Sequence, residues 1–376
     1  MTRVGIVGGG QLGMMLAEAG ATIGIDCTTL DPAPDSPASR VAPAIVGAYD
    51  DEEALAELAA ASDVVTYEFE NVPVASARFL ADRVRVAPPP ASLEFAQDRL
   101  LEKTLFEEVG LAVAPFAPVA TNEELDEALD VVGVPSVLKT RRLGYDGKGQ
   151  ARLVSGDDAP EAWRSIGVAP SILESLVPFD RELSILGARG EDGAVAFYPL
   201  VENVHRDGIL RVSIAPAADV APGLQAEAER LALGLMERLG HVGVLAIELF
   251  QVEDRLLGNE FAPRVHNSGH WTIEGAATSQ FENHLRAICG LRLGSTTSSL
   301  VSVMVNAIGS VPDLSVLPTG SGVYLHEYGK SPRPDRKVGH VTAIGDDRET
   351  LRRRLAFITP STVIDRHRGS HRDERP

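Results

Sequence analysis

The sequence predicts a protein of mixed α/β and α+β class, with a parallel sheet at the N-terminus, a central domain of antiparallel sheets and a small β-rich C-terminal domain. Three observations support this prediction. Short apolar runs alternate with helical stretches over the first ninety residues, three prolines follow at 88–90, and longer strand-like runs dominate the remainder. A length of 376 residues fits two or three domains of about 150 residues each.

Residues 1–90 are predicted to form a Rossmann-like domain. Alternation of buried strands with short helices is typical of a doubly wound parallel sheet. The expected strands are 3–7, 25–30, 44–46, 64–67 and 84–86, and the expected helices include 11–19 and 52–61. Because consecutive prolines continue neither a helix nor a central strand, Pro88–Pro90 marks the first domain boundary.

Residues 91–294 are predicted to form the central domain and residues 295–376 the small C-terminal one. Helices are expected at 91–109, 122–131 and 223–239, and strands at 135–140, 170–174, 181–188, 193–198, 209–215, 242–252 and 255–261. The third domain is rich in Ser, Thr, Val and Gly up to residue 345. It then has a short helix at 347–356 and a charged tail, 365–376, that we expect to be frayed.

Composition excludes several classes of protein. The chain has 53 acidic and 35 Lys or Arg residues, a net charge of −18, which disfavours general nucleic-acid binding. No apolar stretch approaches the roughly 20 residues of a membrane span, so we expect no membrane association. Cys27 and Cys289 are far apart in sequence, which excludes a disulfide scaffold and suits a reducing compartment. We therefore expect a soluble cytoplasmic protein.

A glycine-rich turn, Gly8–Gly13, follows the first predicted strand and precedes a helix. It fits the G-x-G-x-x-G pattern, and Asp31 ends the next strand, where an acid that binds a ribose would lie. Glycines there allow an anion to approach a helix N-terminus. A nicotinamide or flavin oxidoreductase remains open on this motif alone, as does a tight turn with another ligand or none.

A second glycine-rich loop runs from Lys139 to Gln150, with glycines at 144, 147 and 149. Its flexible backbone could fold over phosphate oxygens while Lys139 and Lys148 supply positive charge. The loop is not a Walker motif, and a plain hairpin with solvated lysines is the alternative.

Two glutamates, Glu248 and Glu260, lie on consecutive predicted strands that turn at Glu253–Asp254. Since residue 254 lies midway between them, we expect them nearly opposite one another, with Cβ atoms about 5 Å apart. Two carboxylates that close need a proton or a cation between them. With Asn259 beside them, hard oxygen ligands favour magnesium. Salt-bridged glutamates are the alternative, and a register slip would separate the pair.

The segment 264–270 gathers Arg264, His266, Asn267, Ser268 and His270 with few apolar groups between them. Packing does not explain such a cluster, and an arginine fork suits bicarbonate, carboxylate or phosphate. A weaker basic cluster, suited to a phosphate or else a solvated surface loop, contains Lys330, Arg333, Arg336 and Lys337.

Taken together, these segments resemble the ATP-grasp ligases, and among them most closely the family of 5-(carboxyamino)imidazole ribonucleotide synthetases. The resemblance covers nearly the whole chain. Its signatures, in order, are GGGQLGM (8–14), YEFENV (67–72), QDRL (97–100), GYDGKGQ (144–150), ESLVPFDRELS (174–184), NEFAPRVHNSGHWT (259–272) and YGK (328–330). Leu143, where many relatives have a third glycine, and Val265, where some have proline, depart from the pattern.

The resemblance implies a Rossmann-like N-terminal domain, an ATP-grasp central domain and a role for each motif. It implies that ATP, with Mg²⁺ or alternatively Mn²⁺, is held by Arg99, Lys139, the covering loop of Gly144, Tyr145, Asp146, Gly147, Lys148, Gly149 and Gln150, and by Glu174, Ser175, Leu176, Val177, Glu182, His205, Asn259 and Glu260. The metal ligands would be Glu248, Glu260 and Asn259.

The same resemblance implies the residues at the reaction centre. Arg264 and His266 would position bicarbonate or carboxyphosphate, and Tyr145, Asp146 and Lys148 would face the ribonucleotide. Asp146 would orient its amine or accept the proton of that amine. Substrate binding is expected from Gln11, Leu12, Asn267, Ser268, Gly269, His270, Lys330, Arg336 and Lys337.

The implied activity is the ATP- and bicarbonate-dependent carboxylation of 5-aminoimidazole ribonucleotide through carboxyphosphate, in purine biosynthesis, by a homodimer. Two alternatives stay open. One is another ATP-grasp ligase, such as a formate-dependent glycinamide ribonucleotide transformylase or a biotin carboxylase. The other, of a different class, is an NAD(P) oxidoreductase that uses Gly8–Gly13 and Asp31.

Overall fold

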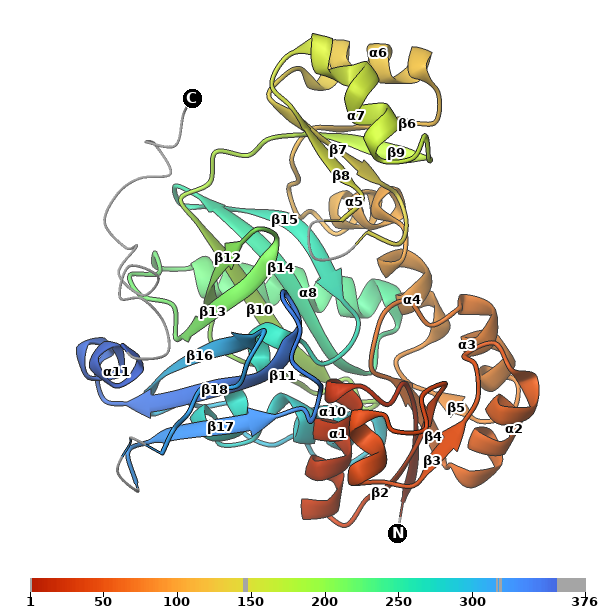
Figure 1. The fold of residues 1–376 in the computed structure, drawn as a ribbon, viewed down its shortest axis with the longest axis vertical. Coiled ribbons are helices and arrows are strands. Elements are labelled where there is room, and N and C mark those ends of the chain that lie inside the picture. The colour runs from red at the N-terminus through yellow and green to blue at the C-terminus, as the bar shows by residue number, and fades with distance from the viewer. Residues whose placement is uncertain (1, 145–147, 316, 318–319, 357–376) are drawn as a thin grey trace.

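The computed structural model of the chain describes residues 2–144, 148–315, 317 and 320–356. Three sheets organise these residues (Figure 1). The predicted loop residues Tyr145, Asp146 and Gly147 and the predicted frayed tail lie outside the described residues.

The N-terminal sheet is parallel throughout, with strand order β3-β2-β1-β4-β5. One face packs on α1, which also contacts α10, while α2 and α3 cover the other face. The doubly wound sheet predicted for this segment is therefore confirmed. Its elements are β1 (Arg3–Val7), α1 (Gln11–Thr22), β2 (Asp26–Asp31), η1 (Pro37–Arg40), β3 (Ala44–Val46), α2 (Glu52–Ala61), β4 (Val64–Tyr67), α3 (Val74–Ala81) and β5 (Arg85–Val86).

The helix expected over 91–109 is wrong as a single element, because it is two helices, α4 (Pro90–Ala96) and α5 (Arg99–Glu108). The break occurs at Asp98, whose carboxylate accepts a hydrogen bond from the Leu100 amide at 3.1 Å and caps α5. The same carboxylate binds Arg141 at 2.7 Å, so the break ties α5 to the start of the second glycine-rich loop.

A four-stranded antiparallel sheet, β6-β9-β7-β8, forms a separate lobe at the top of Figure 1. Its apolar face packs against α6 and α7, leaving the ends of β7 and β8 directed toward the rest of the molecule. The lobe contains β6 (Phe116–Val119), α6 (Asn122–Val132), β7 (Ser136–Thr140), β8 (Gln150–Leu153), η2 (Gly156–Asp158), α7 (Ala159–Ser165) and β9 (Ser171–Ser175).

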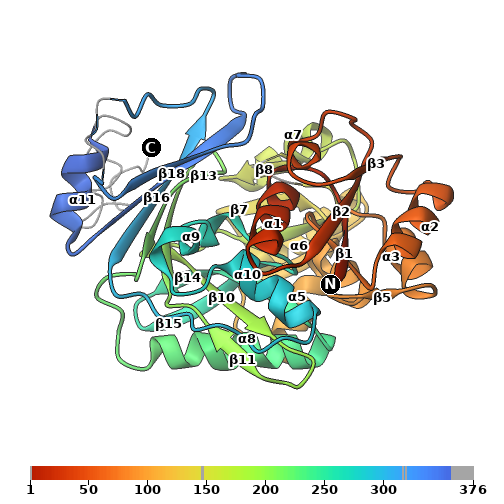
Figure 2. The same ribbon diagram turned by 90° about the horizontal axis from the view of Figure 1, so that it is seen from below.

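The largest sheet follows the order β15-β14-β10-β12-β13-β16-β18-β17, with β11 paired to β10. Helix α8 packs its apolar side on one face of the central strands and, with α5, buries a core there. The opposite face of β10 and β14 packs on α10, which in turn contacts α1 of the N-terminal segment (Figure 2). The elements are β10 (Arg181–Arg189), β11 (Val195–Phe197), β12 (Val201–Arg206), β13 (Ile209–Ala215), α8 (Leu224–Leu239), β14 (Gly243–Val252) and β15 (Arg255–Ala262).

The C-terminal strands extend this sheet, because β16 pairs antiparallel with β13. The β-rich character expected after residue 294 is present, but its strands share one sheet with the central segment. The boundaries at 90 and 294 stay predictions. The remaining elements are η3 (Asn267–Gly269), α9 (Thr272–Gly275), α10 (Gln280–Ile288), β16 (Val301–Ile308), β17 (Val323–Glu327), β18 (Lys337–Gly345) and α11 (Arg348–Leu355). No helix among the described residues is long and apolar enough to cross a membrane.

Candidate active site

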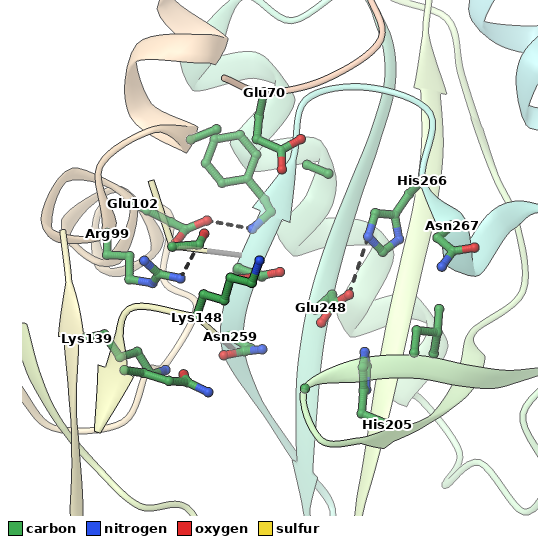
Figure 3. A pocket seen from close by; sticks show the side chains of 18 of the residues that line it. Glu70, Arg99, Glu102, Lys139, Lys148, His205, Glu248, Asn259, His266 and Asn267 are labelled. Atoms are coloured by element: carbon green, nitrogen blue, oxygen red, sulfur yellow. Dashed lines mark hydrogen bonds and ion pairs between the residues drawn. The ribbon is translucent and has the colours of Figure 1, made fainter. Parts of the chain in front are cut away.

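A cavity of about 520 Å³ opens where the three sheets meet. Figure 3 shows charged side chains from α5, β7, β12, β14 and β15 pointing into it. Most of the described site residues predicted from sequence line this cavity: Gln11, Leu12, Arg99, Lys139, Gly144, Lys148, Gln150, Glu174, Leu176, Glu182, His205, Glu248, Asn259, Glu260, Arg264, His266, Asn267, His270 and Lys337.

Seven other described residues with predicted site roles are not in the cavity lining: Ser175, Val177, Gly149, Ser268, Gly269, Lys330 and Arg336. Ser268 is fully buried and binds the ring of His266. Lys330 reaches Gln11 by a hydrogen bond to its side-chain oxygen, which joins the basic C-terminal cluster to the first glycine turn. Arg336 binds Ser331, so it stays within its own loop.

The carboxylate pair lies as the sequence predicts, with Glu248 on β14 directly opposite Glu260 on β15. A regular two-residue turn at 253–254 would instead pair Glu248 with Asn259, as the register of the first four pairs from the turn shows. A β-bulge between Glu248 and Leu249 shifts the register by one residue, so that both carboxylates share a face. The predicted pairing is thus confirmed.

Side chains from α5 satisfy the backbone groups around this bulge. The Lys103 Nζ donates to the Gly258 carbonyl at 3.2 Å and to the Asn259 carbonyl at 2.8 Å. The Glu102 carboxylate accepts from the Phe261 amide at 2.7 Å. Because both side chains are buried, their contacts fix the backbone on either side of Glu260.

Neither Glu102 nor Lys103 was identified from sequence. A signal was available: Glu102 stands four residues before Phe106, which places a charge on the buried stripe of its helix. Burial and then the charge of Glu260 raise the pKa of Glu102. Burial has the opposite effect on a cation, and it lowers the pKa of Lys103.

Glu248 lies in a similarly negative setting. Burial and the neighbouring charge of Glu260 raise the pKa of Glu248 above its ordinary value. Accumulated negative charge of this kind, with the amide of Asn259 alongside, suits a hard divalent cation. Among the described residues no group of three or more His, Cys, Asp or Glu side chains is arranged to hold a metal ion.

Positive charge enters the cavity from the four-stranded lobe. Lys139 at the end of β7 binds the buried Glu174 at 2.5 Å, and Lys103 binds the same carboxylate at 3.2 Å. Burial alone would raise the pKa of Glu174, but the two lysines lower it to about 2. Glu174 therefore holds two ammonium groups near each other at the cavity wall.

On the far wall, the Nδ1 of His205 lies 2.7 Å from the carboxylate of Glu182. Burial would lower the pKa of His205, but the hydrogen bond to Glu182 and the charges of Glu248, Glu182 and Glu260 raise it to about 9. His205 is consequently a cation that faces the carboxylate pair.

Arg264 and His266 follow β15 and come to the edge of the same cavity. The Arg264 guanidinium forms an ion pair with Glu70, a member of the YEFENV motif to which sequence analysis gave no role. The Nε2 of His266 lies 3.4 Å from Glu248 (Figure 3). Burial, followed by the charges of Arg264 and Lys337, lowers the pKa of His266, which favours the neutral ring.

The side-chain oxygen and nitrogen of Asn267 are both buried and have no hydrogen-bond partner within the described part of the chain. It lines the cavity beside His266. A buried amide without partners costs free energy unless a ligand satisfies it, which supports its predicted contact with substrate.

The first glycine turn is occupied by the protein's own carboxylates. Glu68 accepts hydrogen bonds from the amides of Gly10 and Gly13, the latter at 2.6 Å. Asp31 accepts from the Gly9 amide and the Tyr49 hydroxyl, each at 2.8 Å. The amides and the acid that a dinucleotide would need are therefore engaged within the fold.

Comparison with known proteins gives consistent matches along the chain. Family models match at residues 1–97 (ribonucleotide synthetase preATP-grasp domain), 104–281 (ATP-grasp domain) and 302–354 (phosphoribosylaminoimidazole carboxylase C-terminal domain). The chain is 48% identical over 356 residues to the N5-carboxyaminoimidazole ribonucleotide synthase of Pseudomonas aeruginosa, covering 95% of this chain and 98% of that one. It is 51% identical to the Brucella melitensis synthase, covering 91% and 96%.

Solved structures that resemble this chain come from the same family as these relatives. The N5-carboxyaminoimidazole ribonucleotide synthetase of Thermus thermophilus superposes with a TM-score of 0.91 at 51% identity, covering 98% of this chain and 100% of that one. The Aspergillus clavatus N5-carboxyaminoimidazole synthase, solved with ADP and 5-aminoimidazole ribonucleotide, gives a TM-score of 0.87 at 32% identity, covering 97% and 99%.

Proposed function

The chain belongs to the family of N5-carboxyaminoimidazole ribonucleotide synthases, and on that premise we propose that its cavity uses ATP and bicarbonate to carboxylate 5-aminoimidazole ribonucleotide. The product is N5-carboxyaminoimidazole ribonucleotide, an intermediate of purine biosynthesis. The observation that carries the assignment to this cavity is the Glu248–Glu260 pair, brought to one face by the bulge and surrounded by basic side chains.

The reaction proceeds in two steps. A bicarbonate oxygen attacks the γ-phosphorus of ATP, the bond to the β-phosphate oxygen breaks, and ADP leaves with carboxyphosphate formed. The exocyclic amine of the ribonucleotide then bonds to the carboxyl carbon, delivered directly or as CO₂, while phosphate leaves and the amine loses a proton. Phosphorylation is needed because bicarbonate is a poor electrophile until its carbon has a leaving group.

Basic side chains of the cavity would stabilise the charge that moves in the first step. Lys139 and Arg99 would bind the nucleotide phosphates, and Arg264 would orient bicarbonate with its planar fork. His266, being neutral, would offer a hydrogen bond to carboxyphosphate without adding charge. Asp146, in the covering loop outside the described residues, is the group proposed to meet the amine.

Mg²⁺, or alternatively Mn²⁺, is proposed to be held by Glu248, Glu260 and Asn259 together with the phosphates of ATP. When bound, the ion supplies charge neutralisation at the transferring phosphoryl group. The raised pKa of Glu248 supports the assignment, because the burial and neighbouring negative charge that raise it are relieved by a cation.

Three further expectations accompany the proposal: a homodimer, a cytoplasmic location and no binding of nucleic acid. The first comes from the family resemblance and the third from the net charge of −18. Light scattering would test the homodimer, and a nucleic-acid titration at physiological salt would test the third expectation.

The proposed function is tested by ADP release from ATP in the presence of bicarbonate, with and without 5-aminoimidazole ribonucleotide. Full turnover is expected only with both. Turnover with formate and glycinamide ribonucleotide, or with biotin in place of the aminoimidazole, would assign the chain to another ATP-grasp activity and contradict the proposal.

A further inference from the structure

We propose that two buried side chains, Asn203 and Ser184, which continue a hydrogen-bond chain from Ser213, fix His266 in the tautomer that carries its proton on Nε2 and so presents an N–H donor to the cavity. The consequence for catalysis rests on the proposed function, whereas the tautomer itself does not.

The three side chains lie on neighbouring strands of the large sheet, β13, β12 and β10. The Ser213 hydroxyl donates to the Asn203 side-chain oxygen at 2.8 Å, and the Asn203 amide donates to the Ser184 oxygen at 3.0 Å. Ser184 then donates to Ser268 at 2.8 Å. Ser184 and Ser213 are fully inaccessible and Asn203 is 4% exposed, so water does not compete for these bonds.

The direction of donation along the chain determines what reaches the histidine. Because Ser184 accepts from Asn203, its own proton points to Ser268. Ser268 accepts that proton, which leaves its own hydroxyl proton to be donated to the His266 Nδ1 at 2.8 Å. The Ser268 main-chain amide points to the same nitrogen at 3.3 Å. Two donors require Nδ1 to be the bare, accepting nitrogen of the neutral ring.

The other side of the ring faces Glu248, whose carboxyl oxygen lies 3.4 Å from the His266 Nε2. A proton on Nε2 points toward that oxygen and the cavity. The tautomer itself is selected at Nδ1, where the Ser268 hydroxyl and main-chain amide converge.

The catalytic consequence follows from the nitrogen that faces the cavity. With its proton on Nε2, His266 donates a hydrogen bond to an oxygen of the bicarbonate or carboxyphosphate and does not take a proton from it there. Ser184 and Asn203 act through His266 as positioning residues, in the way that outer partners of a catalytic histidine set its orientation and tautomer.

The test uses the full chain labelled with ¹⁵N-histidine and long-range ¹H–¹⁵N spectra, which distinguish protonated from bare ring nitrogens. The spectrum of His266→Gln assigns the His266 signals by their loss. We expect wild-type protein to show a bare Nδ1 and a protonated Nε2. A protonated Nδ1 in the wild type would overturn the proposal.

Two variants reverse or release the chain. Asn203→Asp keeps the size of the side chain but offers only acceptors when ionised, so Ser184 turns its proton to it and Ser268 turns to Ser184. We expect the His266 proton to move to Nδ1.

Ser184→Ala frees Ser268 to rotate, and we expect signals of both tautomers. Ser213→Ala is the matched control, because the Asn203 amide still donates to Ser184 and the tautomer should not change.

The rate measurement separates positioning from folding. In whichever of the two variants shifts the tautomer, we expect kcat to fall by about 10–100-fold, with the KM for ATP and the melting temperature near those of Ser213→Ala. A wild-type ¹⁵N pattern in both Asn203→Asp and Ser184→Ala overturns the proposal, whatever their rates. If wild-type protein fails to carboxylate the aminoimidazole, the proposed function fails while the tautomer result stands.

Discussion

The first glycine turn and the β14–β15 hairpin both look like ligand sites in the sequence, but in the structure their polar groups are paired differently. At the turn, the helix amides bind Glu68 and the predicted ribose acid binds the Gly9 amide and Tyr49, so donors and acceptors are matched internally. At the hairpin, two carboxylates share a face, and burial with the charge of Glu260 raises the pKa of Glu248. An unbalanced group of charges, more than a glycine pattern, identifies where a ligand binds.

The largest effect is expected at the hairpin. Glu260→Gln removes one of two charges proposed to hold the metal, and ATP turnover should fall by at least about 100-fold. The measurement is ADP release at saturating substrates. Glu253→Gln, at the exposed turn of the same hairpin, is the control and should be close to wild type. Full turnover in Glu260→Gln would contradict the claim that the hairpin, and not the glycine turn, is where the ligand binds.

The next effect concerns the bulge that brings the carboxylates together. Lys103→Met removes the ammonium that binds the Gly258 and Asn259 carbonyls, so Glu260 loses its fixed direction. We expect kcat to fall by about 10–100-fold, with lower stability, because Glu174 loses one of its cations. Thr104→Ala, on the exposed side of the same helix, serves as control. If kcat were unchanged, the bulge would hold without the Lys103 ammonium.

A smaller effect, on stability, depends on pH. The folded protein lowers the pKa of Glu174 to about 2 from an ordinary value of 4.5. A lowered carboxyl pKa adds stability that is present above pH 4.5 and is lost as pH falls toward 2. Glu174→Gln should therefore lose most unfolding free energy near neutrality, and its curve should approach wild type as pH falls. Denaturant unfolding from pH 7 down to pH 2 measures this, with Glu161→Gln, exposed on α7, as control. A difference independent of pH would contradict the assigned ion pairs.

The smallest effect on activity is expected at the glycine turn. Glu68→Gln leaves one of its two amide partners facing an NH₂ group and should cost about 1–3 kcal/mol of unfolding free energy. The KM for ATP should not change, and NADH should bind neither form. Glu57→Gln, exposed on α2, is the control for stability. NADH binding that is stronger in Glu68→Gln than in the wild type would place a dinucleotide at the turn.

Sequence was sufficient for much of this architecture. The five parallel strands of the N-terminal sheet and the antiparallel β14–β15 hairpin follow from apolar runs and turns. The break at Asp98 was missed because the helical pattern continues through it, and only the contact with Arg141 shows why two helices form. The pattern likewise contains no sign that β16 continues the central sheet, because sheet order depends on long-range pairing.

The site could be predicted to the level of residue types but not of contacts. The Glu248–Glu260 pairing was predicted by symmetry about residue 254, yet a bulge at Asn259 is what produces it. Glu70 binds Arg264, which is 194 positions away in the sequence, and Lys103 binds Asn259, which is 156 positions away. Partners so distant in sequence become visible only in three dimensions. The roles of the individual site residues stay predictions.

The most direct test of the contrast is a crystal structure with Mg²⁺, ADP and 5-aminoimidazole ribonucleotide. We predict the diphosphate and the ion between Lys139 and the Glu248–Glu260 pair, with Glu68 still bound to the Gly10 and Gly13 amides. A nucleotide phosphate at Gly8–Gly13 with Glu68 displaced, or an ion held away from both Glu248 and Glu260, would contradict the account.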